Sequence, residues 1–291
     1  MHEYLKAIGF SNIKTRKELK NLLTDVQKSY DWEEMISVAP GSDFCEYRKD
    51  YGKDIGISIF GEPDDNYEFE MDCYFPYFNG KGITSYADII VERRMDREIY
   101  VGICEEIKIG VSLIFHLQNI VEYKKQKQLG NMHKSSASIT LSGLSDGGTI
   151  LLPIKKTEIQ EKAELEESRN RMMLLSAAKT GDQNAIETLT LEDMDIYSQV
   201  SQRLVTEDVF SIVDTYFMPY GIECDRYSIM GTILEKSEVV NEITSEEMYV
   251  FTLDVNELKF DVCVPKKYVI GEPAIGRRFK GNIWLQGKIN F

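Results

Sequence analysis

The sequence has few of the residues that catalytic and metal-binding sites require. Its 291 residues include three histidines and five cysteines. The cysteines are too widely separated for a metal knuckle or a redox pair, and no histidine spacing suggests a metal site. Residues 79–85 lack the leading glycine and the Lys-Ser or Lys-Thr pair of a phosphate-binding loop, so we expect a plain turn there. The sequence therefore predicts no catalytic residue, no metal site and no cofactor.

The sequence also lacks a long apolar run. Its most apolar stretch, residues 107–117, is interrupted by Lys108 and His116 and is too short to span a bilayer. The first residues carry charges of both signs and lack the apolar core of a signal peptide. An odd number of dispersed cysteines indicates a reducing compartment. We expect a cytoplasmic protein without membrane contact.

Basic residues are in deficit, because 48 acidic residues face 34 basic ones and the formal net charge is −14. Such a chain repels the phosphate backbone of nucleic acid over most of its surface, so any contact with nucleic acid requires a local basic patch. Residues 219–291 carry 11 acidic and 9 basic side chains, a net charge of −2. This segment is the least acidic part of the chain.

Hydrophobic periodicity divides the chain into three segments and predicts an α+β fold. Residues 1–154 open with two short helices, the second with a capping box at Thr15 and Glu18, and continue with the two-residue alternation of an antiparallel β domain. A hairpin is expected around the Asp146-Gly147 dipeptide. Residues 155–218 have helical spacing and predict a connector, with one helix ending at Gly181 and another opening at Thr190.

Residues 219–291 are expected to form a small closed β-barrel of four or five strands. In residues 249–264 apolar and polar residues alternate on both sides of a two-residue turn, so that Val255 is expected to face Leu258. The strand count in about seventy residues resembles a barrel of the oligonucleotide-binding type. This comparison rests on fold alone and does not decide function.

Trp284 is the sharpest functional hint in the sequence. Residues 279–291 alternate strictly, and Trp284 falls on the polar face with lysines and amides. It is either a docking surface or a lid packed on a neighbouring element, and packing against the helical connector is favoured. With the cations Arg277, Arg278, Lys280 and Lys288 it would form a platform for single-stranded nucleic acid, a possible but not favoured partner.

Two further groups of residues allow alternative interpretations. The aromatic and proline cluster of residues 74–78 presents Tyr74 and Tyr77 either as a binding platform or as a domain junction, and its place beside a predicted boundary favours the junction. Six carboxylates in residues 62–72 keep a carboxylate-dependent hydrolase open as an alternative. Their spacing does not fit a calcium loop, so a solvated strand face is the preferred interpretation.

Three stretches carry a family resemblance, namely residues 2–11, 208–221 and 271–287. Together they resemble a domain-of-unknown-function family of clostridial, anaerobic Gram-positive bacteria, over the full length of the chain. The resemblance implies a bacterial cytoplasmic setting and one architectural unit, and it assigns no activity. Our leading hypothesis is therefore a non-catalytic binding or scaffolding protein with an unknown protein partner or self-association.

Overall fold

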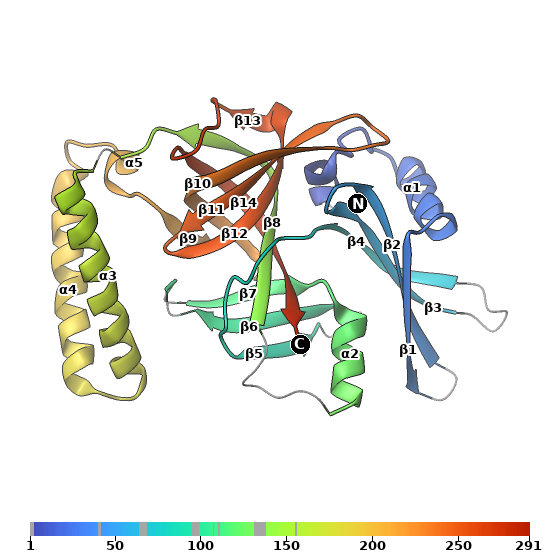
Figure 1. Cartoon of the computed structure of the whole chain (residues 1–291), viewed down its shortest axis with the longest axis horizontal. Helices are drawn as coiled ribbons and strands as arrows, with labels where there is room; N and C mark the ends of the chain where they lie inside the picture. The colour runs from blue at the N-terminus through green and yellow to red at the C-terminus, as the bar shows by residue number, and fades with distance from the viewer. Residues whose placement is uncertain are drawn as a thin grey trace.

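A four-stranded antiparallel sheet occupies one end of the molecule. The computed structural model describes residues 3–39, 42–63, 69–94, 99–106, 108–109, 111–130, 138–154 and 156–291. The first sheet has the order β1-β2-β3-β4, with bounds Trp32–Ala39, Ser42–Gly52, Ile55–Pro63 and Phe69–Phe78. Two N-terminal helices lie near this sheet, the 3-10 helix η1 (Glu3–Ile8) and α1 (Arg16–Lys28) (Figure 1). The predicted capping box is present at Thr15 and Glu18.

The second sheet is mixed and contains ten strands. Its order is β13-β8-β12-β11-β10-β14-β7-β6-β5, and β9 pairs with β10. The bounds are β5 Ile89–Arg93, β6 Tyr100–Glu106, β7 Val111–Leu117, β8 Ser138–Leu151, β9 Tyr216–Pro219, β10 Arg226–Val240, β11 Glu247–Val255, β12 Leu258–Pro265, β13 Val269–Ile270 and β14 Arg278–Asn290. The helix α2 (Ile120–Gln128) follows β7, and the 3-10 helix η2 (Lys266–Tyr268) precedes β13. The α+β prediction is therefore confirmed at the level of secondary structure.

The C-terminal strands do not form a barrel by themselves. β14 pairs with β10, with β7 and along its whole length with β8, and β8 also pairs with β12 through three residues. Both β7 and β8 come from the predicted N-terminal segment. A closed barrel of residues 219–291 alone, and its likeness to an oligonucleotide-binding barrel, are therefore not confirmed. The pairings join β10, β11, β12 and β14 into a ring only together with β8, and this ring belongs to the ten-stranded sheet that crosses the predicted segment boundaries.

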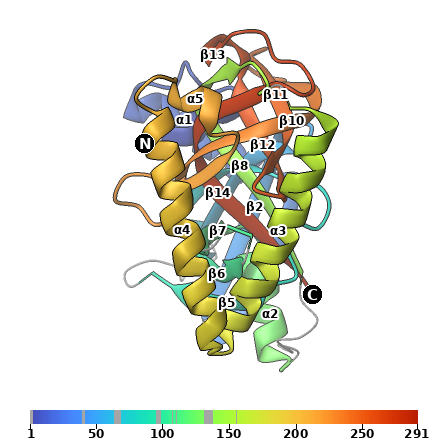
Figure 2. The same ribbon diagram turned by 90° about the vertical axis from the view of Figure 1, so that its left-hand side faces the viewer.

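The helical hairpin of α3 (Glu158–Lys179) and α4 (Gln183–Arg203) stands at the opposite end of the molecule from α1 (Figures 1 and 2). Asp182 caps α4 by accepting hydrogen bonds from two backbone N–H groups, as the Gly181-Asp182 stop signal predicts. The expectation that Thr190 opens a helix is wrong. Its hydroxyl donates to the Ile186 carbonyl in the interior of α4, so α4 continues through it. A short helix, α5 (Val209–Ile212), leads back to β9.

The predicted hairpin at Asp146-Gly147 is also wrong, because these residues lie inside the fourteen-residue strand β8. Backbones approach closely there. A Cβ on Gly147 would lie 2.9 Å from the Tyr268 carbonyl oxygen, and one on Gly148 would lie 2.4 Å from the Phe279 ring. The glycines therefore permit close packing along the strand instead of reversing the chain.

The β11–β12 hairpin confirms the register predicted from sequence, with Val255 opposite Leu258. Both turn residues are left-handed, Asn256 at φ 52° and Glu257 at φ 65°, as a two-residue hairpin turn requires. The apolar faces of both sheets join one continuous core that includes η1 and α2. None of the helices formed by the described residues is long and apolar enough to cross a membrane.

Candidate binding cleft

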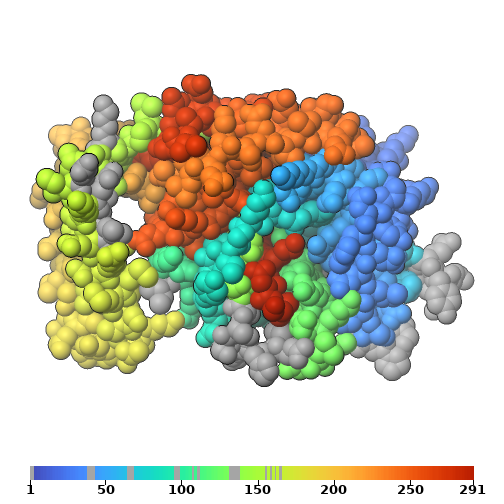
Figure 3. Space-filling view, in the orientation of Figure 1, coloured from blue at the N-terminus to red at the C-terminus, as the bar shows by residue number. Residues whose placement is uncertain are grey.

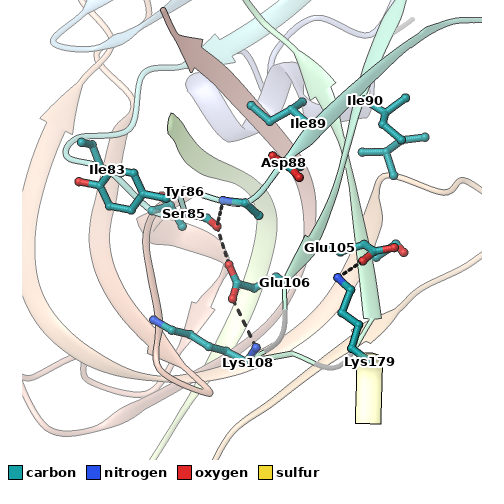
Figure 4. A pocket seen from close by; sticks show the side chains of 14 residues that line it. Ile83, Ser85, Tyr86, Asp88, Ile89, Ile90, Glu105, Glu106, Lys108 and Lys179 are labelled. Atoms are coloured by element: carbon teal, nitrogen blue, oxygen red, sulfur yellow. Dashed lines mark hydrogen bonds and ion pairs between the residues drawn. The ribbon is translucent and has the colours of Figure 1, made fainter. Parts of the chain in front are cut away.

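A cleft of about 820 Å³ lies between the edge of the ten-stranded sheet and the end of α3 (Figure 4). Its walls come from residues 83–88, from β5 and β6, and from Ser112 on β7. Lys179, at the C-terminal end of α3, closes one side. The cleft therefore joins residues 83–112 to Lys179, which lies 67 positions after Ser112 in the sequence.

A hydrogen-bonded turn fixes the floor of the cleft. The Ser85 hydroxyl donates to Oε2 of Glu106 over 2.6 Å, and the backbone N–H of Ala87 donates back to the Ser85 hydroxyl over 3.1 Å. The second carboxylate oxygen of Glu106 accepts from the Lys108 N–H over 3.3 Å. Ser85 also forms a β-bridge with Ile139. Both side chains are buried, so the pair holds residues 83–88 against the sheet.

An ion pair ties the helical hairpin to the sheet at one end of the cleft. The Lys179 ammonium group contacts the Glu105 carboxylate, and Figure 4 shows the two side chains meeting across the opening. Both side chains are more than half exposed, so the pair contributes little to stability. The pair nevertheless places a positive charge, on Lys179, and a negative charge, on Glu105, at the rim of the cleft.

Large apolar side chains lie exposed along the cleft. Ile83 is 51%, Tyr86 77% and Ile90 61% exposed, which is unusual for residues gathered in one concavity. Ile90 belongs to β5, the last strand of its sheet. Among the described residues, no strand pairs with the outer edge of β5.

The hydrogen-bond pattern shows which backbone groups of β5 face outward. The Arg94 N–H donates to the Ile99 carbonyl over 2.8 Å, one position beyond the pairing of Arg93 with Tyr100. In an antiparallel pair, hydrogen-bonded and non-hydrogen-bonded positions alternate. The N–H and C=O groups of Ile89 and Val91 therefore point away from β6 and toward the free edge.

Two of the three carboxylates that line the cleft already have partners. Asp88, Glu105 and Glu106 all line it, but Ser85 and the Lys108 backbone occupy Glu106, and Lys179 contacts Glu105. The described residues contain no group of histidines, cysteines and carboxylates that would hold a metal ion. The described members of the predicted carboxylate cluster, Glu62, Glu70 and Asp72, lie exposed on β3 and β4 outside the cleft, whereas Asp64, Asp65 and Glu68 lie outside the described residues.

Trp284 packs in the interior and is only 5% exposed. Its Nε1 donates to Oδ2 of Asp225 over 3.1 Å, and its ring lies 4.9 Å from the imidazole of His116 and 5.8 Å from the ring of Tyr4. Trp284 is therefore not exposed as a docking surface. The tryptophan is packed, but against N-terminal residues instead of the helical connector.

The four predicted cations do not form one basic patch. Buried Arg278 donates to the backbone carbonyls of three residues that lead into and out of the helical hairpin: Leu152, Phe210 and Val213. Arg277 donates to the Glu272 carbonyl, and Lys280 lies 4.1 Å from the centroid of the Phe210 ring. Burial lowers the pKa of Lys288 on the opposite half of β14. Their observed contacts therefore hold the chain together locally.

The two predicted tyrosines lie on β4. The Tyr77 hydroxyl donates to Asp50, and burial raises the pKa of Tyr77 well above its usual range. Tyr77 also lines a small cavity between the two sheets with His116 and Gln286. Tyr74 is partly buried on the same strand. None of the seven predicted binding residues lines the cleft near β5.

The segment Gly143-Leu-Ser145-Asp-Gly147 matches the Gly-x-Ser-x-Gly pattern of a nucleophile elbow. Ser145 lies in the middle of β8 and is fully buried. Its hydroxyl oxygen is 2.8 Å from the carbonyl oxygens of Gly147 and Asn282. A buried serine in a continuous strand has no access to substrate, so the match carries no catalytic function.

Sequence reasoning missed the cleft residues. The sequence predicts a plain turn at Ser85, and no pattern around Tyr86 and Ile90 distinguishes an exposed from a buried side chain. The adjacent acids Glu105 and Glu106 at the end of a strand-like run were the available signal. Glu106 is buried and accepts from Ser85, whereas Glu105 is exposed and pairs with Lys179, because successive strand residues point to opposite faces.

Comparison with known proteins gives a family without an assigned activity. Searches of the curated proteins and of the solved structures each found no match to this chain. A family model matches residues 5–287, nearly the whole chain, and its description is "Domain of unknown function, E. rectale Gene description (DUF3881)". The three stretches that carried the resemblance fall almost entirely within this match. The chain belongs to this family of unknown function, DUF3881.

Proposed function

We propose that the protein is a non-catalytic binding protein that takes up an extended, basic segment of a partner polypeptide along the free edge of β5. The single observation that carries the proposal is the coincidence of this unpaired strand edge with the wall of the cleft. A peptide that adds a strand gains main-chain hydrogen bonds, and pockets beside the edge select its alternate side chains.

The side chains around β5 indicate the composition of the segment. Ile83, Tyr86 and Ile90 offer exposed apolar surface for alternate side chains of an added strand. Asp88 and Glu92 are exposed carboxylates along the same edge. Together with the net charge of −14 they favour lysine or arginine at the intervening positions of the peptide.

A defined peptide tests the proposal. The probe is a fluorescently labelled decapeptide of alternating valine and lysine, titrated with the full chain and followed by fluorescence anisotropy. Val91→Pro removes an outward N–H without removing a bond to β6, so the variant should fold and bind about tenfold more weakly. Val91→Thr keeps the N–H and the side-chain shape, and it should bind as the unaltered chain does.

Hydrogen exchange locates the bound peptide. The amides of Ile89 and Val91 should exchange more slowly when the peptide is present, while those of Ile90 should change little because they already face β6. A peptide of alternating valine and glutamate is the charge control and should bind more weakly. Equal binding by Val91→Pro and Val91→Thr, or protection that appears only elsewhere, would show that β5 is not the binding edge.

A further inference from the structure

The helical hairpin of α3 and α4 is not packed on the hydrophobic core. Among the described residues, neither the core nor the side chains packed against it include any position between Ile150 and Phe217. The two buried residues of α4, Ala185 and Leu189, lie outside this core. Elements that lack core packing move at a low cost in free energy. The contacts between the hairpin and the strands therefore decide where the hairpin stands.

The base of the hairpin is fixed by Arg278, which is buried on β14. Its Nη2 donates to the carbonyl of Leu152, which precedes α3, over 2.9 Å, and to the carbonyl of Phe210, which follows α4, over 2.7 Å. Its Nη1 donates to the Val213 carbonyl over 2.8 Å. One guanidinium group thus holds the segments that enter and leave the hairpin against the same strand. The base cannot leave the sheet without breaking these bonds.

Farther from its base, exposed polar side chains connect the hairpin to the strands. The Ser168 hydroxyl on α3 donates to the Glu257 carboxylate in the β11–β12 turn, and Lys179 at the end of α3 contacts Glu105. A cavity of about 130 Å³ lies between α3 and this turn. The space-filling view shows openings between the hairpin and the strands (Figure 3). Exposed contacts of this kind are weak, so the end of the hairpin far from Arg278 is loosely held.

Lys179 reaches the face of the sheet that forms the cleft. Ile90 of β5 lies opposite Ile103 of β6, and Glu105, two positions farther along β6, points to the same face as Ile103. All four residues line the cleft (Figure 4). The ion pair between Lys179 and Glu105 therefore places the end of the hairpin on the side of the sheet that carries the exposed Ile90. The distance between the hairpin and β6 thus sets how far the cleft is open.

We propose that the α3–α4 hairpin is a hinged lid on the cleft, which turns about Arg278 and is held closed by the ion pair between Lys179 and Glu105. Rotation of a rigid element about its ends is a common form of hinge motion. An exposed ion pair changes an equilibrium by only about two- to fivefold. Salt screens such a pair, so a rise in ionic strength should move the hairpin towards the open position. The lid is a property of the chain alone and does not depend on peptide binding at β5.

Distance measurements on the full chain test the proposal. The background is Cys224→Ser, which removes the one exposed cysteine among the described residues. Nitroxide labels at Gln183→Cys, at the start of α4, and at Glu92→Cys, on β5, report the distance from the hairpin to the sheet by pulsed electron paramagnetic resonance. At low salt one short distance should dominate. At about 0.5 M salt a longer distance should gain about two- to fivefold in weight relative to the short one.

Charge reversal identifies the contact that closes the lid. Lys179→Glu places two like charges together and should raise the ratio of the long to the short distance by about fivefold or more. The double variant Lys179→Glu with Glu105→Lys restores the pair in reverse and should restore the short distance. Lys162→Glu is the matched control, because it makes the same change of charge on an exposed residue near the start of α3. It should leave the distances unchanged, and circular dichroism should show the same helix content in every variant.

The proposal is overturned by a single distance that neither salt nor Lys179→Glu changes, since the hairpin would then be fixed to the strands. A double variant that remains open, or an equal opening in Lys162→Glu, would show that this ion pair does not close the lid. Loss of helix in Lys179→Glu would assign the longer distance to unfolding of the hairpin and overturn the proposal too. Because no peptide is present, a failure of peptide binding at β5 leaves these results unaffected.

Discussion

The indole Nε1 of Trp284 donates a hydrogen bond to Oδ2 of Asp225, and this bond joins the centre of β14 to the turn that precedes β10. Asp225 also lies 3.3 Å from the guanidinium of Arg94, and it is only 4% exposed. The tryptophan thus partners a buried carboxylate while its ring fills space between the two sheets. Its role follows from the structure as an interior support.

Replacement of Trp284 should lower stability strongly. Trp284→Phe keeps most of the packing but leaves Asp225 with one partner fewer, so we expect a loss of about 2 kcal/mol in the free energy of unfolding. Trp284→Ala should cost about 3–5 kcal/mol because it also leaves a cavity. Urea unfolding monitored by circular dichroism measures both. Trp32→Phe is the control, because Trp32 is 40% exposed and its replacement should cost well under half as much.

The amide of Gln286 should prove essential for the contact between the sheets. Its Oε1 accepts from the Phe78 N–H over 3.1 Å and from Gln118 over 2.8 Å, and its Nε2 donates to the Pro76 carbonyl over 2.8 Å. Gln286→Leu leaves these buried groups without partners and should cost at least about 2 kcal/mol. In a double-mutant cycle with Gln118→Leu the two losses should not add, because the residues share a bond. Strict additivity would contradict the network.

Stability should fall on mild acidification because of His116. Burial, and secondarily the charge of Arg94, lowers the pKa of His116 to about 3, whereas an unfolded chain takes up this proton near pH 6.5. Above pH 6.5 protonation of His116 therefore takes nothing from the free energy of unfolding. As the pH falls below this value the free energy of unfolding decreases, by about 2 kcal/mol at pH 5. Urea midpoints at pH 7.5, 6 and 5 measure the slope. His116→Phe should show a smaller loss over this range, and an unchanged slope would exclude His116 as the cause.

Gly148 should not tolerate a side chain. A Cβ there would lie 2.4 Å from the Phe279 ring and 2.7 Å from the Lys280 carbonyl oxygen, and the backbone atom cannot move away easily. We expect Gly148→Ala to cost about 2 kcal/mol in the free energy of unfolding, although alanine suits a strand better than glycine. Thr149→Ala, one position along β8, should cost less than half of this. Thermal unfolding of both variants gives the comparison.

Local features of the fold were predictable from sequence. The capping box of Thr15 and Glu18, the helix stop at Gly181 and the pairing of Val255 with Leu258 depend on residues within a few positions of one another. Such local signals predict the conformation of a short segment without reference to the rest of the chain.

Features set by distant contacts were not predictable. Alternation places Trp284 and Gln286 on one face of a strand, but it does not tell which element covers that face. Gln286 is covered by Phe78, 208 positions away. The Asp146-Gly147 dipeptide is a strong turn signal. In the structure, however, Gly147 is needed because a side chain there would collide with the neighbouring backbone. The cleft could not be predicted for the same reason, because Ser85 and Lys179 line one cleft only in the folded chain.

The central place of β14 has a consequence for synthesis of the protein on the ribosome. Residues 278–290 pair with β7, β8 and β10, so three strands made earlier keep unsatisfied edges until this segment has left the exit tunnel. The nascent chain therefore resembles a sheet with a gap, and exposed strand edges are the usual starting point of aggregation. A product truncated before residue 278 should therefore be retained by chaperones, whereas a released chain that includes β14 completes the sheet.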